Sequence, residues 1–216
     1  IQVEITAPID YVGEAIEVNR DATIDFKGNA LNAGSTASSM NYALEINGCD
    51  VKIYNANFTR AGIAADHGAN VTFYSSKINH KPERTSRYIF TAHNGSIITV
   101  EGGTFTNDRA KNSYFWADTN AQIIVKGGTF NGVASNKKVV ESAGGKVIIY
   151  GGTFNFDPTA WVAEDYIAKK SGNNWVVKLD AVEDATQLAD ALANAADGDK
   201  INLMDGVNYG DVTVGE

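Results

Sequence analysis

Short runs of alternating apolar and polar residues recur along the first 154 residues of the chain. The clearest three are residues 98–105 (ITVEGGTF), 123–130 (IIVKGGTF) and 147–154 (VIIYGGTF). In each run, apolar residues stand seven and five positions before the final Phe, with a polar or outward position between them. This alternation predicts a β-strand that shows one face to a core.

Three weaker copies of the same phrase extend the series. They are residues 24–31 (IDFKGNAL), 51–58 (VKIYNANF) and 71–78 (VTFYSSKI). The last residue of each copy serves as an anchor, and the anchors are Leu31, Phe58, Ile78, Phe105, Phe130 and Phe154. Successive anchors are 20 to 27 residues apart. A period in the twenties is typical of a solenoid in which each repeat forms one coil.

The positions within the repeat indicate which solenoid this is. Apolar residues seven before the anchor are Ile24, Val51, Val71, Ile98, Ile123 and Val147, and those five before it are Phe26, Ile53, Phe73, Val100, Val125 and Ile149. Ten before the anchor stand Asp21, Gly48, Gly68, Gly95, Asn120 and Gly144, residue types that tolerate the positive φ of a tight corner. Each inward side chain contributes about 1.5–3 kcal/mol when buried, and stacked coils bury what no coil could bury alone. We therefore predict an all-β fold, a parallel β-helix of about six coils over residues 1–156.

The remaining residues predict a cap and an appendage. Residues 157–180 form a turn-rich segment and a hairpin that carries Trp161 and Trp175, suited to cover the open end of the last coil. Residues 181–216 predict a short amphipathic helix capped by Asp184, followed by a strand at 200–203.

Composition narrows the range of functions. The net charge is −8, most of it in the last 53 residues, and this acidity argues against a nucleic-acid partner. No apolar run approaches the roughly 18 residues of a membrane span, so no membrane insertion is expected. The single Cys49 excludes an intrachain disulfide, and we expect it to be a buried filler. We expect no cofactor and no metal, because Asp197, Asp199, Asp205 and Asp211 fall on a turn motif.

The repeats resemble the pectate-lyase-like superfamily of right-handed parallel β-helices over about residues 15–156. The GGTF phrases, followed by 155–162 (NFDPTAWV) and 172–177 (GNNWVV), resemble a terminal module of surface proteins from gut bacteria and of virion proteins from their phages. Residues 183–214, with GDKINLMDG at 198–206, are similar to the segment that opens such solenoids. The resemblance implies a virion or bacterial cell-surface location and two solenoids in tandem. It is compatible with a homotrimer, although no heptad pattern is present.

A binding edge is one candidate site. All length variation falls between an anchor and the first strand of the next coil, so insertions should emerge along one edge of the solenoid. The side chains expected to bind there are Arg84, Arg87, Tyr88, Arg109, Lys111, Tyr114 and Trp116. The basic residues Arg60, Lys81, Lys137 and Lys138 belong to the same edge. These residues are open to two interpretations, a recognition surface or ordinary solvated loops.

A catalytic column is the other candidate. Asp66, His93 and Asp118 all stand twelve positions before an anchor, so they should lie on neighbouring rungs. At about 4.8 Å per rung, the two carboxylates would be about 9.6 Å apart, near the upper limit for an inverting glycosidase, with His93 as a possible acid. The alternative is a polar outer ladder, because His93 fills the gap that a sugar and a water would need.

These observations favour a non-catalytic structural and adhesion module of a phage virion or bacterial surface. Its partner would be a cell-surface glycan or another virion or surface protein. A polysaccharide-degrading lyase or glycoside hydrolase is the alternative, although the superfamily's hydrolase phrases are absent. A protein attachment or capsid-decorating module is a third hypothesis.

Overall fold

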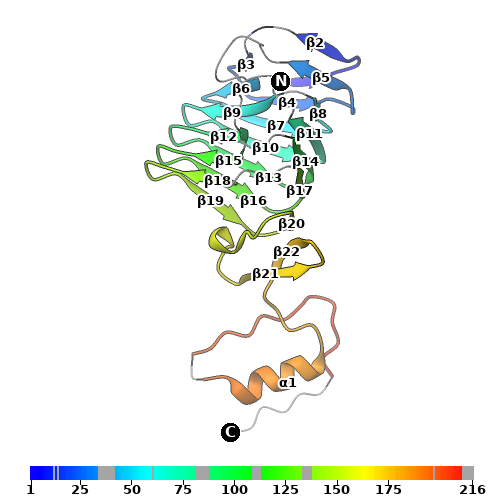
Figure 1. Ribbon diagram of the computed structural model, residues 1–216, viewed down its shortest axis with the longest axis vertical. Coiled ribbons are helices and arrows are strands. Elements are labelled where there is room, and N and C mark those ends of the chain that lie inside the picture. Colours follow the sequence, from blue (N-terminus) through cyan, green and yellow to red (C-terminus); the bar gives the residue numbers. More distant parts are fainter. Residues whose placement is uncertain are drawn as a thin grey trace.

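The chain winds into a solenoid of three parallel sheets, which we call A, B and C (Figure 1). The computed structural model describes residues 1–11, 13, 15–33, 42–59, 61–80, 88–108, 113–132, 138–196 and 198–210. Each coil contributes one strand to each sheet in turn, so the predicted parallel β-helix is confirmed. Six strands in sheet C make about five full turns, slightly fewer than the six coils expected.

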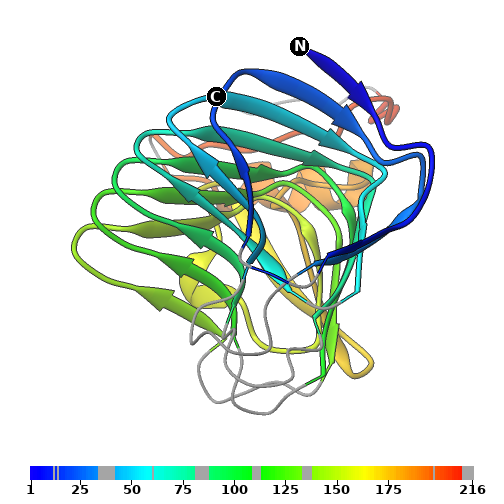
Figure 2. The ribbon, with the colours of Figure 1, turned by 90° about the horizontal axis from the view of Figure 1, so that it is seen from above.

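The strands stack in sequence order within each sheet. Sheet A holds β1 (Gln2–Glu4), β4 (Ala22–Asp25), β7 (Asp50–Tyr54), β10 (Asn70–Tyr74), β13 (Ile97–Val100), β16 (Gln122–Val125) and β19 (Lys146–Ile149). Sheet B holds β2 (Ile9–Tyr11), β5 (Ala30–Ala33), β8 (Asn57–Phe58), β11 (Ser76–His80), β14 (Gly103–Asn107), β17 (Thr129–Gly132) and β20 (Gly152–Phe154). Sheet C holds β3 (Ile16–Val18), β6 (Tyr42–Asn47), β9 (Gly62–Asp66), β12 (Tyr88–Ala92), β15 (Ser113–Ala117) and β18 (Val139–Glu141). Seen from the N-terminal end, the path from A to B to C runs clockwise as it recedes, so the solenoid is right-handed (Figure 2).

The predicted anchors form one ladder inside sheet B. Leu31, Phe58, Ile78, Phe105, Phe130 and Phe154 pair with one another in direct register from coil to coil. All six are at most 1% exposed. The rings of Phe105 and Phe130 stack at 4.9 Å and those of Phe130 and Phe154 at 4.8 Å, which is the spacing of adjacent strands. Ile9 adds a further rung against Leu31 that the repeats did not reveal.

The register in the first coil differs from the prediction. Ile24 pairs with Ile53, and Ala22 takes the place opposite Val51. Leu31 stands seven positions after Ile24, whereas Phe58 stands only five positions after Ile53, the residue that pairs with Ile24. The two extra residues of the first coil form a bulge at the corner. Phe26 fills that corner, where its ring lies 5.2 Å from the ring of Phe58.

The tight corners between sheets C and A adopt the predicted conformation. Gly48, Gly68, Gly95, Asn120 and Gly144 all have positive φ. The corner at Asp21 is built differently, because its carboxylate accepts a hydrogen bond of 2.9 Å from the backbone N–H of Asp50. Near these corners, Cys49 is 7% exposed and its thiol donates to the carbonyl of Val18, as expected of a buried filler.

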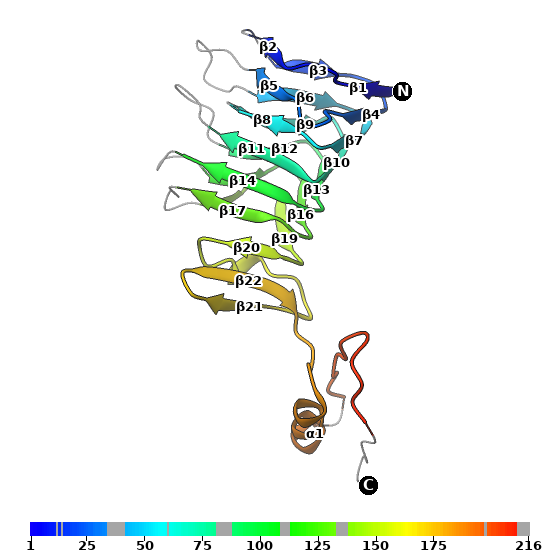
Figure 3. The same cartoon turned by 90° about the vertical axis from the view of Figure 1, so that its right-hand side faces the viewer.

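A hairpin closes the C-terminal end of the solenoid (Figure 3). Strand β22 (Asn174–Leu179) pairs antiparallel with β20, and β21 (Tyr166–Ser171) pairs with β22. A 3-10 turn, η1 (Thr159–Trp161), precedes the hairpin. This arrangement covers the last Phe of the ladder, because Trp175 lies opposite Phe154.

Among the described residues, one α-helix is present, and it lies beyond the hairpin (Figures 1 and 3). Helix α1 (Ala185–Asn194) is capped as predicted, because the Asp184 carboxylate accepts from the backbone N–H of Gln187 at 2.8 Å. The strand expected at 200–203 is reduced to one parallel bridge between Val182 and Leu203. Within the described residues, no helix is long and apolar enough to cross a membrane.

Candidate functional site

Asp66, His93 and Asp118 lie at equivalent positions on three successive rungs of sheet C. Asp66 ends β9, whereas His93 and Asp118 directly follow β12 and β15. The backbone N–H of His93 donates to Ala65 at 2.9 Å, and that of Asp118 donates to Ala92 at 3.1 Å. The three side chains therefore stand one above another along the outer edge of the sheet.

Both carboxylates of this column are already engaged. His93 Nδ1 lies 2.6 Å from Oδ1 of Asp118, and both side chains are less than one-fifth exposed. Asp66 Oδ1 accepts from Asn94 Nδ2 at 2.7 Å and from the backbone N–H of His67 at 2.6 Å. The imidazole occupies the space between the two acids. The geometry is that of a polar ladder that fixes a corner.

An aromatic layer lies beside this ladder on the outer face of sheet C. The rings of Tyr88 and Trp116 are 4.8 Å apart, and Trp116 also meets His93 edge-on at 4.7 Å. Beneath the layer, Ala64 and Thr91 are 2% and 0% exposed although they alternate with core residues and so face outward. Large rings therefore cover small outward side chains.

Tyr42 is the third member of this layer. It pairs in register with Gly62, where a Cβ would stand 2.2 Å from the carbonyl oxygen of Ile89, so the backbones of β9 and β12 approach closely at this point. Burial raises the pKa of the Tyr42 hydroxyl to about 12, and the negative charges of Glu45 and Asp118 add to the shift. We call Tyr42, Tyr88 and Trp116 the aromatic layer.

Glu45 supplies a carboxyl group with a perturbed pKa next to the aromatic layer. It stands directly opposite Glu17 in the parallel register of β3 and β6. Partial burial, followed by the charges of Glu17 and Asp66, raises the pKa of Glu45 above its ordinary value. Like charges at paired positions disfavour double ionisation.

The expected binding residues fall into three groups. Tyr88 and Trp116 meet on the outer face, as described above. Tyr114 lies instead in the core, fully buried, with its hydroxyl donating to the carbonyl of Asn131 at 2.5 Å. Tyr114 is therefore not on the expected binding edge. It is buried because Tyr114 and Phe115 both point inward, which breaks the alternation of inward and outward residues. Lys138 is partly buried, and burial lowers its pKa.

The other expected binding residues lie outside the described part of the chain; these are Arg60, Lys81, Arg84, Arg87, Arg109, Lys111 and Lys137. Tyr42 and Glu45 were not predicted as site residues from the sequence. A usable signal existed, because Tyr42 opens its coil just as Tyr88 and Tyr114 open theirs.

Among the residues that the structure describes, no group of three or more His, Cys, Asp or Glu side chains is arranged to hold a metal ion. No protein-family model, curated protein or solved structure matches this chain.

Proposed function

We propose that this protein is a non-catalytic adhesion module of a phage virion or a bacterial surface, and that it binds cell-surface glycan through the outer face of sheet C. The observation that carries the proposal is the aromatic layer on a rigid parallel sheet, in which the rings of Tyr88 and Trp116 are partly exposed, Tyr42 is buried and carboxylates lie nearby. The GGTF repeats further support a place in the pectate-lyase-like superfamily.

The chemistry of this face suits a sugar. Aromatic rings offer apolar surface to the C–H groups of a pyranose at low entropic cost, and carboxylates accept hydrogen bonds from its hydroxyls. Because the rings lie on strands rather than on free loops, they are positioned before the ligand arrives. A solenoid also presents such groups at regular intervals along an extended surface.

The state of the Asp66–His93–Asp118 column supports a non-catalytic role. A general acid or base must reach the proton that it transfers, within hydrogen-bond distance or through one water. Here the imidazole binds Asp118, and Asp66 is used by the corner of the neighbouring coil. Each titratable group of the column therefore stabilises the fold.

A glycan array tests the proposal. Wild type is expected to bind a restricted set of glycans, and Tyr88→Ala and Trp116→Ala are expected to lose at least tenfold in signal, about 1.4 kcal/mol. Tyr150→Ala is the control, because Tyr150 is an exposed aromatic residue on sheet A. An array without hits would contradict glycan binding and favour attachment to a protein.

A polysaccharide-degrading enzyme is the second candidate. The observation that favours it is Glu45, whose raised pKa keeps more of the proton-carrying form near the Asp66 carboxylate. Incubation with bacterial surface polysaccharides and measurement of reducing ends separates the two functions. Release of reducing ends by wild type and not by Glu45→Gln would overturn the adhesion proposal.

A further inference from the structure

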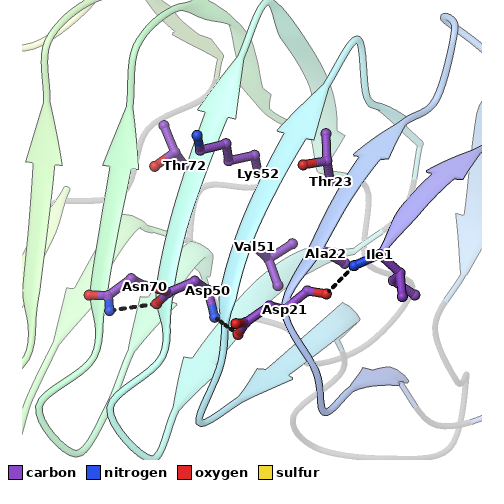
Figure 4. A pocket seen from close by; sticks show the side chains of 9 residues that line it. All are labelled: Ile1, Asp21, Ala22, Thr23, Asp50, Val51, Lys52, Asn70 and Thr72. Carbon is purple, nitrogen blue, oxygen red and sulfur yellow. Dashed lines mark hydrogen bonds between the residues drawn. The ribbon is translucent and has the colours of Figure 1, made fainter.

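A cavity of about 350 Å³ opens on the outer face of sheet A, over β4, β7 and β10 (Figure 4). Its volume lies within the range of roughly 300–1,000 Å³ that is usual for small-molecule sites. Six polar side chains from these three strands and the corner before β4 face it: Asp21, Thr23, Asp50, Lys52, Asn70 and Thr72.

The first row of the cavity is a fixed chain of acceptors. Asp21 Oδ1 accepts from the backbone N–H of Asp50 at 2.9 Å, and Asp50 Oδ1 accepts from Asn70 Nδ2 at 2.8 Å. These bonds run across three rungs in one line (Figure 4). Asp21 and Asp50 are each held through Oδ1 and Asn70 through Nδ2, which orients the Oδ2 atoms of the two carboxylates and the Oδ1 atom of Asn70 for a ligand.

The second row, two residues further along the same strands, adds donors. Thr23, Lys52 and Thr72 pair in direct register on β4, β7 and β10. The Lys52 ammonium group lies towards Thr72 in Figure 4. An ammonium group only donates, whereas each hydroxyl both donates and accepts. The two rows are therefore complementary in hydrogen bonding.

This combination selects a class of ligand. The carboxylates of Asp21 and Asp50 are balanced by the ammonium groups of Lys52 and of the Ile1 N-terminus, which favours a neutral ligand, and the polar lining disfavours an apolar molecule. A polyol with hydroxyl groups on neighbouring carbons can donate to the first row and accept from the second. Neighbouring groups within a row are one rung, about 4.8 Å, apart, and the two rows are two strand residues, about 6.6 Å, apart, so hydroxyl groups of one ligand can reach both rows.

We propose that this groove on sheet A is a second binding site, which takes a neutral saccharide. It lies on a different sheet from the aromatic layer and uses none of the same residues (Figure 2). The proposal therefore does not depend on glycan binding at sheet C.

Backbone amide NMR during titration with a panel of neutral mono- and disaccharides tests it. We expect saturable shifts confined to β4, β7 and β10, with a Kd on the order of 1 mM because the groove is open. Lys52→Ala and Thr72→Val are each expected to weaken binding about tenfold, as loss of a ligand hydrogen bond does.

Two matched controls make the test specific. Thr99 follows Thr72 in the same column, one rung beyond the groove, so Thr99→Val is expected to leave the titration unchanged. Trp116→Ala is also expected to leave it unchanged, which separates this site from the one on sheet C. No saturable shifts with any saccharide, shifts on sheet C alone, or equal losses in Thr72→Val and Thr99→Val would each overturn the proposal.

Discussion

The anchor ladder of sheet B and the outer face of sheet C repeat at the same rung spacing, but they differ in how much the residue type varies from one rung to the next. The ladder places one fully buried apolar residue on each coil, from Leu31 to Phe154. The outer face of sheet C changes its chemistry from rung to rung, from Glu45 to Ala64, Thr91 and Trp116. Uniformity inside supports stacking, because each rung must fit the next. Variation outside leaves room for recognition.

The largest effect is expected when a substitution creates a cavity in the anchor ladder. Phe130 stacks on Phe105 and Phe154 and is fully buried, so Phe130→Ala should lower the free energy of unfolding by about 3–5 kcal/mol. Urea denaturation followed by circular dichroism measures the change. Lys146→Ala, at an exposed position of β19 on sheet A, is the control, expected to change stability by no more than about 0.5 kcal/mol. Equal losses in the two variants would contradict the ladder's role.

A smaller effect is expected at Tyr114, where the interior carries a polar group. Its hydroxyl donates to Asn131 and lies 3.1 Å from Oδ1 of Asn155, and burial raises its pKa far above the usual range. Tyr114→Phe should cost about 1–3 kcal/mol, because the buried acceptors lose their donor. Tyr150→Phe is the matched control. An unchanged midpoint for Tyr114→Phe would show that Tyr114 is exposed in solution.

The outer face of sheet C should respond to pH through Glu45. Because its pKa is raised in the folded state, folding favours the protonated form, and this contribution is lost as pH rises from 4.5 through the folded pKa. Glu45→Gln should therefore be more stable than wild type at pH 7, with the difference closing below pH 4.5. Unfolding curves at several pH values measure it. Glu17→Gln should reduce the pH dependence, because the charge of Glu17 is one cause of the raised pKa of Glu45. A stability difference between Glu45→Gln and wild type that does not change with pH would contradict this explanation.

The smallest effect is expected for an ion pair on sheet A. Lys126 Nζ lies 2.8 Å from Glu101 Oε1, with the Lys126 side chain half exposed. Lys126→Ala should change the free energy of unfolding by about 0–1 kcal/mol, and less at high salt. A loss of unfolding free energy as large as that of Phe130→Ala would mean that side chains on the outer faces contribute as much to stability as the core ladder does.

Much of the interior was predictable from sequence. A period in the twenties and an alternation of two identify the anchors, because only residues that stack in register recur at fixed offsets. The corners at Gly68 and Gly95 followed from the positive φ that such a turn requires. The first-coil register could not be read, because Ile24 and Phe26 satisfy the alternation equally well.

The outer face was less accessible to sequence reasoning. Tyr114 was placed on the binding edge because it stands beside an inter-coil loop in the sequence, whereas β15 places Tyr114 and Phe115 both in the core. Tyr42 and Glu45 were missed because the partners that define them, Gly62 and Glu17, lie 20 and 28 residues away and meet only in the folded register. Outward positions have no periodic constraint that would reveal them.

The most direct test measures stability and glycan binding for one variant in each of the two regions. Trp116→Ala and Phe130→Ala are each measured for free energy of unfolding and for glycan-array binding at a temperature where both variants are folded. The account predicts that Trp116→Ala loses binding with a smaller loss of stability than Phe130→Ala, and that Phe130→Ala loses stability while its glycan profile is unchanged. Binding that survives in Trp116→Ala, or that falls in parallel with stability in both variants, would contradict it.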